Sequence, residues 1–197
     1  MSGDTDRPDR LPPLPPAQWT EAQRREAQAI IDGPRGALIA PFVPLLRSPE
    51  LMGHAQRMGE YLRYRSALPL RLSELAILDV ARRWSQPVEW AIHAPIALAQ
   101  GVAAATVAAL AAGRAPEDLP EDEAAVLTFC DELQRQRTVG DATWQRALQA
   151  LGETGVVDLM ALVGYYTLLA MVMNASRTPA PPGPRLPPAP PAPPPLP

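Results

Sequence analysis

Glu89 and His93 stand four residues apart in the stretch RWSQPVEWAIHAP, which spans residues 83–95. Side chains at that spacing share one face of an α-helix, so a carboxylate and an imidazole would meet there. In free solution these groups have pKa values of about 4.3 and about 6.5, and burial or a neighbouring charge can move both toward neutrality. The pair therefore has the residue types that general acid/base catalysis requires, although ordinary ion pairs on helices have the same spacing.

A helical hairpin is expected to position this pair. The segment 70–84, LRLSELAILDVARRW, has apolar residues at helical spacing. The segment 86–101, QPVEWAIHAPIALAQG, has a proline suited to a first helical turn and ends at a glycine. Ser85 and Gln86 leave room only for a tight joint, so the two helices should run antiparallel beside each other.

The rest of the chain also predicts helices and no strands. Thr20 and Gln23 have capping-box spacing at the start of one helix, and Ser48 with Pro49 suits the start of another. Asp141 is expected to cap a third helix. Further helices are expected at about 102–112, 120–137, 141–151 and 154–175. The predicted fold class is all-α.

The 26 prolines of the chain are concentrated near its two ends. Proline-rich segments of this kind favour extended conformations and have too few apolar groups to offset the entropy of ordering. The sequence therefore predicts a disordered segment at residues 1–17, one helical domain at 18–177, and a disordered Pro/Ala-rich tail at 178–197.

Composition narrows the setting of the protein. The chain has 197 residues, of which 47% are hydrophobic, enough for a well-buried core. Its 18 basic and 21 acidic side chains form no basic block, which argues against a nucleic-acid partner. Cys130 is the single cysteine, and the first residues, MSGDTDRPDR, lack the layout of a secretion signal. A cytoplasmic location is expected.

The segment 155–175 is about as long and apolar as a membrane span. Asp158 near its start and Asn174 near its end shorten the uncharged stretch, and no basic flank orients it. We therefore expect no membrane insertion but a helix in the core or at a subunit interface. A helix that is apolar on all sides needs more neighbours than one small chain supplies, which favours a homo-oligomer, either a dimer, a trimer or a hexamer.

The spacing of four polar residues carries a family resemblance. Counted from Glu74, Gln86 lies twelve residues on, Glu89 fifteen and His93 nineteen. With LPLRLSELAIL before this set and LTFCDEL and LVGYYTLLAMVMN after it, the chain resembles the carboxymuconolactone decarboxylase and alkylhydroperoxidase (AhpD-like) superfamily over about residues 40–175. The resemblance implies an all-helical fold with a central hairpin, assembled as a homo-oligomer.

The sequence departs from the peroxidase branch of that superfamily. That branch has a CxxC motif, and peroxide reduction needs an attacking thiolate and a resolving thiol. Gln86 and Glu89 occupy the two cysteine positions here, and Cys130 stands in the middle of an amphipathic segment as an expected buried, inert thiol. Thiol peroxidase activity is therefore not expected.

The decarboxylase branch implies acid/base chemistry with neither metal nor organic cofactor. In that chemistry a lactone loses CO2, its unsaturated ring holds the negative charge, and an acid then protonates carbon. The resemblance implies Glu74, Glu89 and His93 as the catalytic set, with Glu74 in support. Candidate substrate-binding residues are Gln86, Trp90, Arg83 and Tyr165, although packing or solvated helix ends would also explain Trp90 and Arg83.

Two kinds of function remain open from the sequence. The first is a cofactor-free lyase, isomerase or hydrolase that acts on a small lactone or related carboxylic acid. The second is a catalytically silent helical oligomer that binds a small molecule or a protein partner. A metal site on Glu89 and His93 is a weaker alternative, because the other histidine, His54, is expected in a different helix and such sites use three or four protein ligands. Burial of three polar side chains without a role would cost several kcal/mol, which favours the enzyme.

Overall fold

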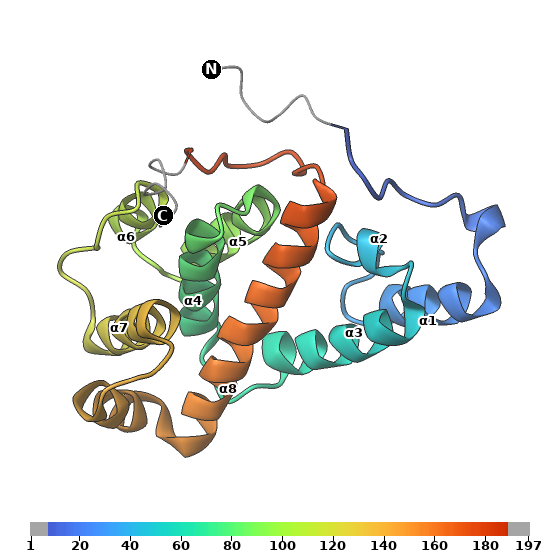
Figure 1. Cartoon of the computed structure of the whole chain (residues 1–197). Coiled ribbons are helices and arrows are strands. Elements are labelled where there is room, and N and C mark those ends of the chain that lie inside the picture. Colours follow the sequence, from blue (N-terminus) through green and yellow to red (C-terminus); the bar gives the residue numbers. More distant parts are fainter. Residues whose placement is uncertain (1–7, 189–197) are drawn as a thin grey trace, which may run out of the picture.

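The computed structural model describes residues 8–188, and within that range the chain contains eight α-helices and no strand. The expected all-α class is therefore confirmed for the described residues. A 3-10 turn at Pro16–Gln18 precedes the helices. They are α1 (Glu21–Ile31), α2 (Phe42–Leu45), α3 (Pro49–Tyr64), α4 (Leu70–Arg83), α5 (Pro87–Ala99), α6 (Ala104–Ala111), α7 (Glu121–Gln136) and α8 (Asp141–Ser176) (Figure 1).

The expected helix starts were confirmed at Thr20 and at Ser48–Pro49, and the expected cap at Asp141 was wrong. Thr20 and Gln23 form the expected capping box, in which each side chain accepts from the backbone N–H of the other residue. Ser48 precedes α3, but its side chain makes no capping hydrogen bond. The N-cap of α8 is Gly140, and Asp141 is the first helical residue, where its charge still favours the positive end of the helix dipole.

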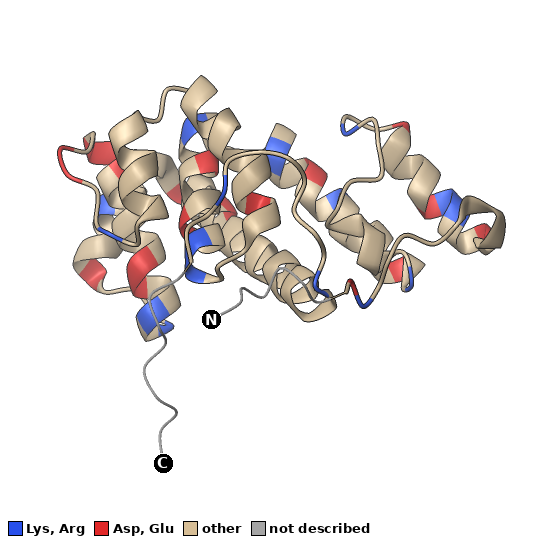
Figure 2. Ribbon diagram, turned by 90° about the horizontal axis from the view of Figure 1, so that it is seen from above, with Lys and Arg blue, Asp and Glu red and all other residues tan. Residues whose placement is uncertain are grey.

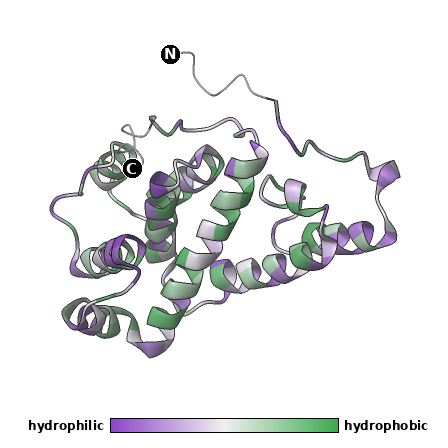
Figure 3. Ribbon diagram, in the orientation of Figure 1, coloured by the Kyte–Doolittle hydropathy of each residue, from purple (hydrophilic) through white to green (hydrophobic). Residues whose placement is uncertain are grey.

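Helix α4 lies at the centre of the molecule, where it packs against α5, α6, α7 and α8 (Figure 1). Nearly all of α4 is buried, including the polar residues Ser73, Glu74 and Asp79. On the other side of α8, helix α3 packs against α1, α2 and α8. The hydrophobic colouring of Figure 3 is strongest where these helices face one another. In Figure 2 acidic and basic residues are mixed along the helices.

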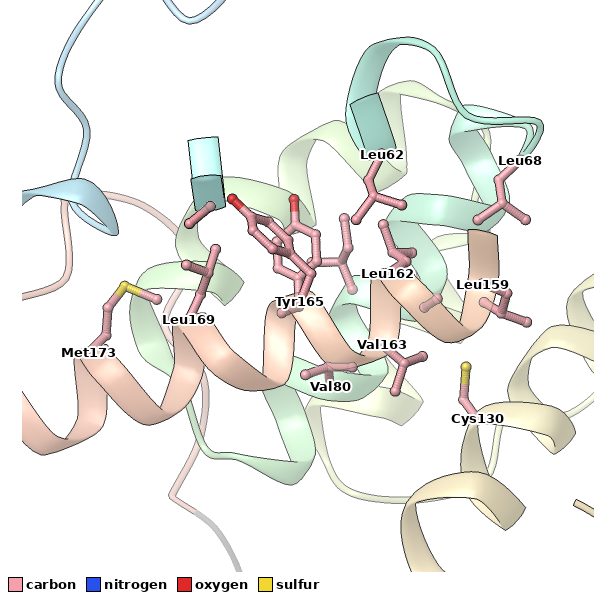
Figure 4. Close-up of a cluster of buried hydrophobic side chains, with 14 of the residues drawn as sticks. Leu62, Leu68, Val80, Cys130, Leu159, Leu162, Val163, Tyr165, Leu169 and Met173 are labelled. Atoms are coloured by element: carbon pink, nitrogen blue, oxygen red, sulfur yellow. The ribbon is translucent and has the colours of Figure 1, made fainter. Parts of the chain in front are cut away.

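Helix α8 is interrupted at Gly152, whose φ of 69° and ψ of 173° are not helical. The two predicted helices at 141–151 and 154–175 are therefore present as two arms joined by a kink. The second arm supplies Leu159, Leu162, Val163 and Leu169 to the main core (Figure 4). This helix is long and apolar enough to span a membrane, and 56% of its apolar 18-residue window is buried inside the protein.

The described parts of both terminal segments, residues 8–17 and 178–188, make hydrogen bonds to the helical part of the chain. Arg10 donates its backbone N–H to Ser176 O at 2.8 Å, and Arg47 donates from Nη2 to Pro12 O at 2.6 Å. At the other end, Arg82 donates from Nη1 to Pro187 O at 2.7 Å. In the contacts of Arg47 and Arg82, backbone carbonyls of extended segments accept from arginine side chains, which composition alone does not reveal. Residues 1–7 and 189–197 lie outside the described residues.

The outer face of α8 carries an apolar stripe, formed by Val157, Ala161, Gly164, Leu168 and Met171. Val157, Leu168 and Met171 are exposed, and Gly164 has open space where a side chain would stand. The steps along this stripe alternate between four and three residues, as in helices that pair along a seam. The sequence predicted a helix apolar on all sides, and this stripe is the side that the rest of the chain leaves uncovered.

We propose that a second copy of the chain covers the α8 stripe. Leu168→Glu should place a charge in that interface and reduce the mass in solution toward that of one chain, 21.2 kDa. The measurement is light scattering coupled to size exclusion at micromolar concentration. Leu98→Glu is the matched control, because Leu98 is an exposed leucine on α5 away from the stripe. A wild-type mass equal to one chain would contradict the proposal.

Candidate active site

The joint between α4 and α5 is as tight as the sequence predicts. Ser85 adopts a left-handed conformation with φ of 48°, and the side chain of Gln86 caps α5 by accepting from Val88 N at 2.6 Å. Asn174, near the end of α8, accepts from Gln86 Nε2 and donates to Trp84 O, each at 2.8 Å. The hairpin is thereby fixed to α8 at its closed end, which sets the register of α4 against α5.

This register brings Glu74, Glu89 and His93 into one cluster. His93 Nδ1 lies 2.6 Å from Glu74 Oε2 across the hairpin, and His93 Nε2 lies 3.4 Å from Glu89 Oε2 on the same helix. The exposed fractions of the three residues are 0% for Glu74, 1% for Glu89 and 3% for His93. The imidazole therefore stands between two buried carboxylates, with one carboxylate at each ring nitrogen.

The two carboxylates determine the charge of His93. Burial by itself would lower the pKa of His93, because the imidazolium loses its water. Contacts with Glu74 and then with Glu89 favour the charged form and outweigh burial, so the pKa lies above the ordinary value of 6.5. At neutral pH this shift favours an imidazolium, which can give a proton to a reacting atom.

A small cavity opens beside this cluster. Its accessible space is about 20 Å³, which is about enough for one water molecule. Glu89, His93, Tyr165 and Tyr166 line one part of it, and Glu74 lies behind His93, outside the lining. The remaining wall consists of Arg35, Ile39, Pro41, Phe42, Arg63, Ile92 and Leu169. Glu89 and His93 can therefore touch a bound molecule, whereas Glu74 positions the imidazole.

Two tyrosines of α8 complete the wall. The rings of His93 and Tyr166 pack edge to face, with their centroids 5.2 Å apart. The rings of Tyr165 and Tyr166 also pack edge to face, with their centroids 5.4 Å apart. Burial raises the pKa of Tyr165 to about 12 and that of Tyr166 well above its ordinary value. Both phenols are therefore neutral at physiological pH, and Tyr165 can donate a hydrogen bond (Figure 4).

Unpartnered polar atoms gather at this cavity. Within the described residues, six buried side-chain nitrogen or oxygen atoms have no hydrogen-bond partner. Four of them belong to residues that line the cavity: Glu89 Oε1, Tyr165 Oη, Arg35 Nη1 and Arg63 Nε. A fifth, Glu74 Oε1, belongs to the carboxylate behind His93. Because buried polar groups are nearly always paired, such a concentration is expected where a ligand supplies the partners.

Three of the predicted substrate-binding residues lie elsewhere, which corrects those assignments. Gln86 is used as the cap and the Asn174 partner at the hairpin joint. Arg83 binds Asp79 and Asp131, each at 2.8 Å. Trp90 faces the second hydrophobic cluster, between α4, α5 and α6. These three residues are close to the motif in sequence, but their side chains lie on other faces of the hairpin. Tyr165 does line the cavity.

Sequence reasoning missed Arg35 and Arg63, which line the cavity from the loop after α1 and from α3. No motif marks either residue, because each comes from a part of the chain distant from the hairpin. Tyr166 was interpreted as a core residue, and its ring is indeed buried while also contacting His93.

The residues do not suggest a resident metal. Among residues 8–188 no group of three or more histidine, cysteine, aspartate or glutamate side chains is placed to hold one ion. Each ring nitrogen of His93 lies against a carboxylate oxygen. Neither nitrogen is therefore directed at a point where a metal ion could also be bound by Glu74 and Glu89.

We expect His93 to titrate above pH 6.5 in ¹⁵N NMR of the imidazole, with His54→Gln used to assign the two histidines. Because the pKa of His93 is higher in the folded than in the unfolded protein, protonation of His93 stabilises the fold. This stabilisation is complete when the pH is below the pKa of the unfolded state, and it is lost as the pH rises through the pKa of the folded state. The free energy of unfolding of the wild type, relative to His93→Gln, should therefore fall as the pH is raised from 6.5. A midpoint below 6.5 would contradict the proposed charge state.

Cys130 should be inert in the folded protein. Its side chain is fully buried between α7 and α8, and burial, with a further contribution from Asp79, raises its pKa well above 9 (Figure 4). Ellman's reagent should react with no thiol in the native protein and with one thiol per chain in urea. Rapid reaction of the native protein would show that Cys130 is accessible.

Comparison with known proteins agrees with this arrangement. Residues 49–129 match the family described as the Carboxymuconolactone decarboxylase family. No curated protein matches the chain. The matched range extends from α3 into α7 and contains the whole hairpin with Glu74, Glu89 and His93. Residues 49–129 therefore form a domain of the carboxymuconolactone decarboxylase family.

Proposed function

We propose that the protein is a cofactor-free acid/base enzyme that acts on a small lactone or related carboxylic acid. The observation that carries this proposal is the contact of His93 with two buried carboxylates at the wall of a cavity. Structural ion pairs seldom leave both carboxylates with an unpartnered oxygen, as Glu74 and Glu89 do here. The family match makes decarboxylation the first reaction to test.

In the proposed decarboxylation, the bond between the carboxylate carbon and the ring breaks and CO2 leaves. The electron pair remains on the ring as a dienolate, because the unsaturated lactone carbonyl accepts it. The His93 imidazolium then gives one proton to the ring carbon, directly or through Glu89, and solvent restores that proton. Glu74 keeps the imidazole oriented and stabilises its charge during the cycle.

The same set of groups can also catalyse isomerisation. In that case Glu89 removes a proton from carbon beside the lactone carbonyl, and His93 returns a proton at another position. Tyr165, as a neutral donor, is placed to bind the oxygen on which charge develops. Proton exchange at carbon is therefore common to both reactions, whichever substrate is used.

The alternative is a catalytically silent helical oligomer that binds a small molecule or a protein. One observation favours the protein-binding form of this alternative: the cavity of about 20 Å³ is too small for a lactone or another small organic molecule unless its wall moves. A thiol peroxidase is not proposed, because the sequence contains one cysteine and a disulfide cycle needs two thiols. We retain a homo-oligomer in the cytoplasm, with neither nucleic acid nor membrane as partner, as a further proposal.

Glu89→Gln and His93→Ala should each reduce turnover by about 10² or more, because each removes a proton-transferring group. Glu74→Gln should cause a smaller loss or lower the stability, since this carboxylate acts through His93. The measurements are CO2 release from carboxymuconolactone and, for substrates without a leaving carboxylate, wild-type-dependent exchange of carbon-bound hydrogen in D2O by NMR. Both are made in chelator-treated buffer.

Glu50→Gln, on the exposed surface of α3, is the matched control and should keep full activity. Circular dichroism should show equal helix content in all variants. Full activity in both Glu89→Gln and His93→Ala would exclude the acid/base proposal. Activity that disappears on chelation and returns with zinc or manganese would replace it with a metal-dependent reaction.

A further inference from the structure

Two arginines from different parts of the chain meet at the cavity. Arg35 comes from the loop between α1 and α2, and Arg63 lies in the last turn of α3. Both line the same space as Glu89 and His93. Neither is within 4 Å of an acidic side chain in the described residues, whereas Arg25, Arg57, Arg65, Arg71, Arg83, Arg135 and Arg146 are. The protein thus places two cations beside its acid/base cluster without giving either one a protein anion.

Each of these arginines also has a buried nitrogen with no acceptor. These atoms are Nη1 of Arg35 and Nε of Arg63. The guanidinium of Arg35 stacks over Phe42 at 5.0 Å, and that of Arg63 over Tyr64 at 5.3 Å. Stacking on aromatic rings holds the planar groups in place while leaving their N–H edges available. A buried donor without an acceptor is costly, so an acceptor supplied by a ligand would remove that cost.

Gly59 shows how closely the groups around the cavity approach one another. A methyl group on Gly59 would overlap the Tyr165 hydroxyl and would lie 2.9 Å from Arg35 Nη2. The loop arginine and the α8 tyrosine therefore converge on one point of α3, one turn before Arg63. This convergence brings three donors, two charged and one neutral, to one side of the cavity.

Formal charges indicate the sign of the missing acceptor. With both glutamates ionised and His93 protonated, the two guanidiniums leave the empty site with a single positive charge. A monoanion would neutralise the site, and a planar carboxylate matches the fork of N–H donors that a guanidinium presents. A cation would leave the arginine donors unpaired, and a neutral acceptor would pair with them without neutralising their charge.

We propose that Arg35 and Arg63 bind a carboxylate that the substrate keeps through the reaction, and not the one that leaves as CO2, and that they orient the substrate ring toward Glu89 and His93. The inference rests on the proposed function for the reaction, but carboxylate binding itself requires no turnover. The loop that carries Arg35, Ile39 and Pro41 must move outward to admit the ring, since the closed space holds only about one water. The same loop then closes over the ligand when Arg35 pairs with it, which excludes water from the acid/base cluster.

The test uses 2-furoate, a flat ring with one carboxylate, and 2-furamide, its neutral counterpart. Binding is measured by NMR titration of the full chain and by ligand-induced thermal stabilisation. Wild type should bind furoate at least about tenfold more tightly than furamide, and Arg35→Gln and Arg63→Gln should each weaken furoate binding about tenfold or more. Furamide binding should be the same in all proteins.

Several controls separate ligand binding from a structural role. Arg57→Gln, a largely exposed arginine of the same helix α3, should leave furoate binding unchanged. Arg63→Lys keeps the charge but not the fork, and should bind furoate with intermediate affinity. Without ligand, Arg35→Gln and Arg63→Gln should melt at the wild-type temperature, because the removed donors have no protein acceptor.

The outcomes for the two proposals can be told apart. Arginine-dependent furoate binding without turnover of any lactone would support the anchor and exclude the enzyme. Lactone turnover with equal furoate binding in wild type, Arg35→Gln and Arg63→Gln would support the enzyme and overturn the anchor. Failure of the wild type to bind furoate, or binding of furamide as tight as furoate, would also overturn the anchor. With turnover, the arginine variants should raise KM more than they lower kcat.

Discussion

The rest of this structure depends on the burial of His93 between Glu74 and Glu89. Removing three ionisable groups from water costs several kcal/mol per ion, and contacts between them offset that cost only when the geometry is good. The 2.6 Å contact between His93 and Glu74 crosses from α5 to α4, so a small shift of one helix along the other would break it. The hydrogen bonds of Asn174 to the hairpin joint therefore support the site, although Asn174 itself does not line the cavity.

The chain divides the work of the site between two regions. The part that matches the carboxymuconolactone decarboxylase family, residues 49–129, contains Glu74, Glu89, His93 and Arg63. Arg35 and Tyr165 come from outside this part, from the loop after α1 and from α8. The proposed acid/base groups thus lie on the hairpin, whereas segments that pack onto the hairpin supply much of the cavity wall.

Helix α8 serves three purposes that its apolar composition alone does not separate. One face fills the core, two tyrosines line the cavity, and the outer stripe is left exposed. The loop 32–41 is the complementary element, because its Arg35, Ile39 and Pro41 line the small cavity. In the proposed reaction, exclusion of water by this wall would strengthen the charge interactions inside the cavity.

The sequence by itself determined the all-α class, most helix positions, the tight hairpin joint and the grouping of Glu74, Glu89 and His93. These depend on local signals, namely helical periodicity, capping residues, prolines at first turns and the spacing of one motif. Only the tertiary structure decided that Gln86, Arg83 and Trp90 face away from the cavity, that Arg35 and Arg63 enter it, and that residues 8–17 and 178–188 lie on the helices. The physical reason is that the packing of the whole chain decides which face of each helix points at the cavity and which distant segments touch. No local pattern of residues records that packing.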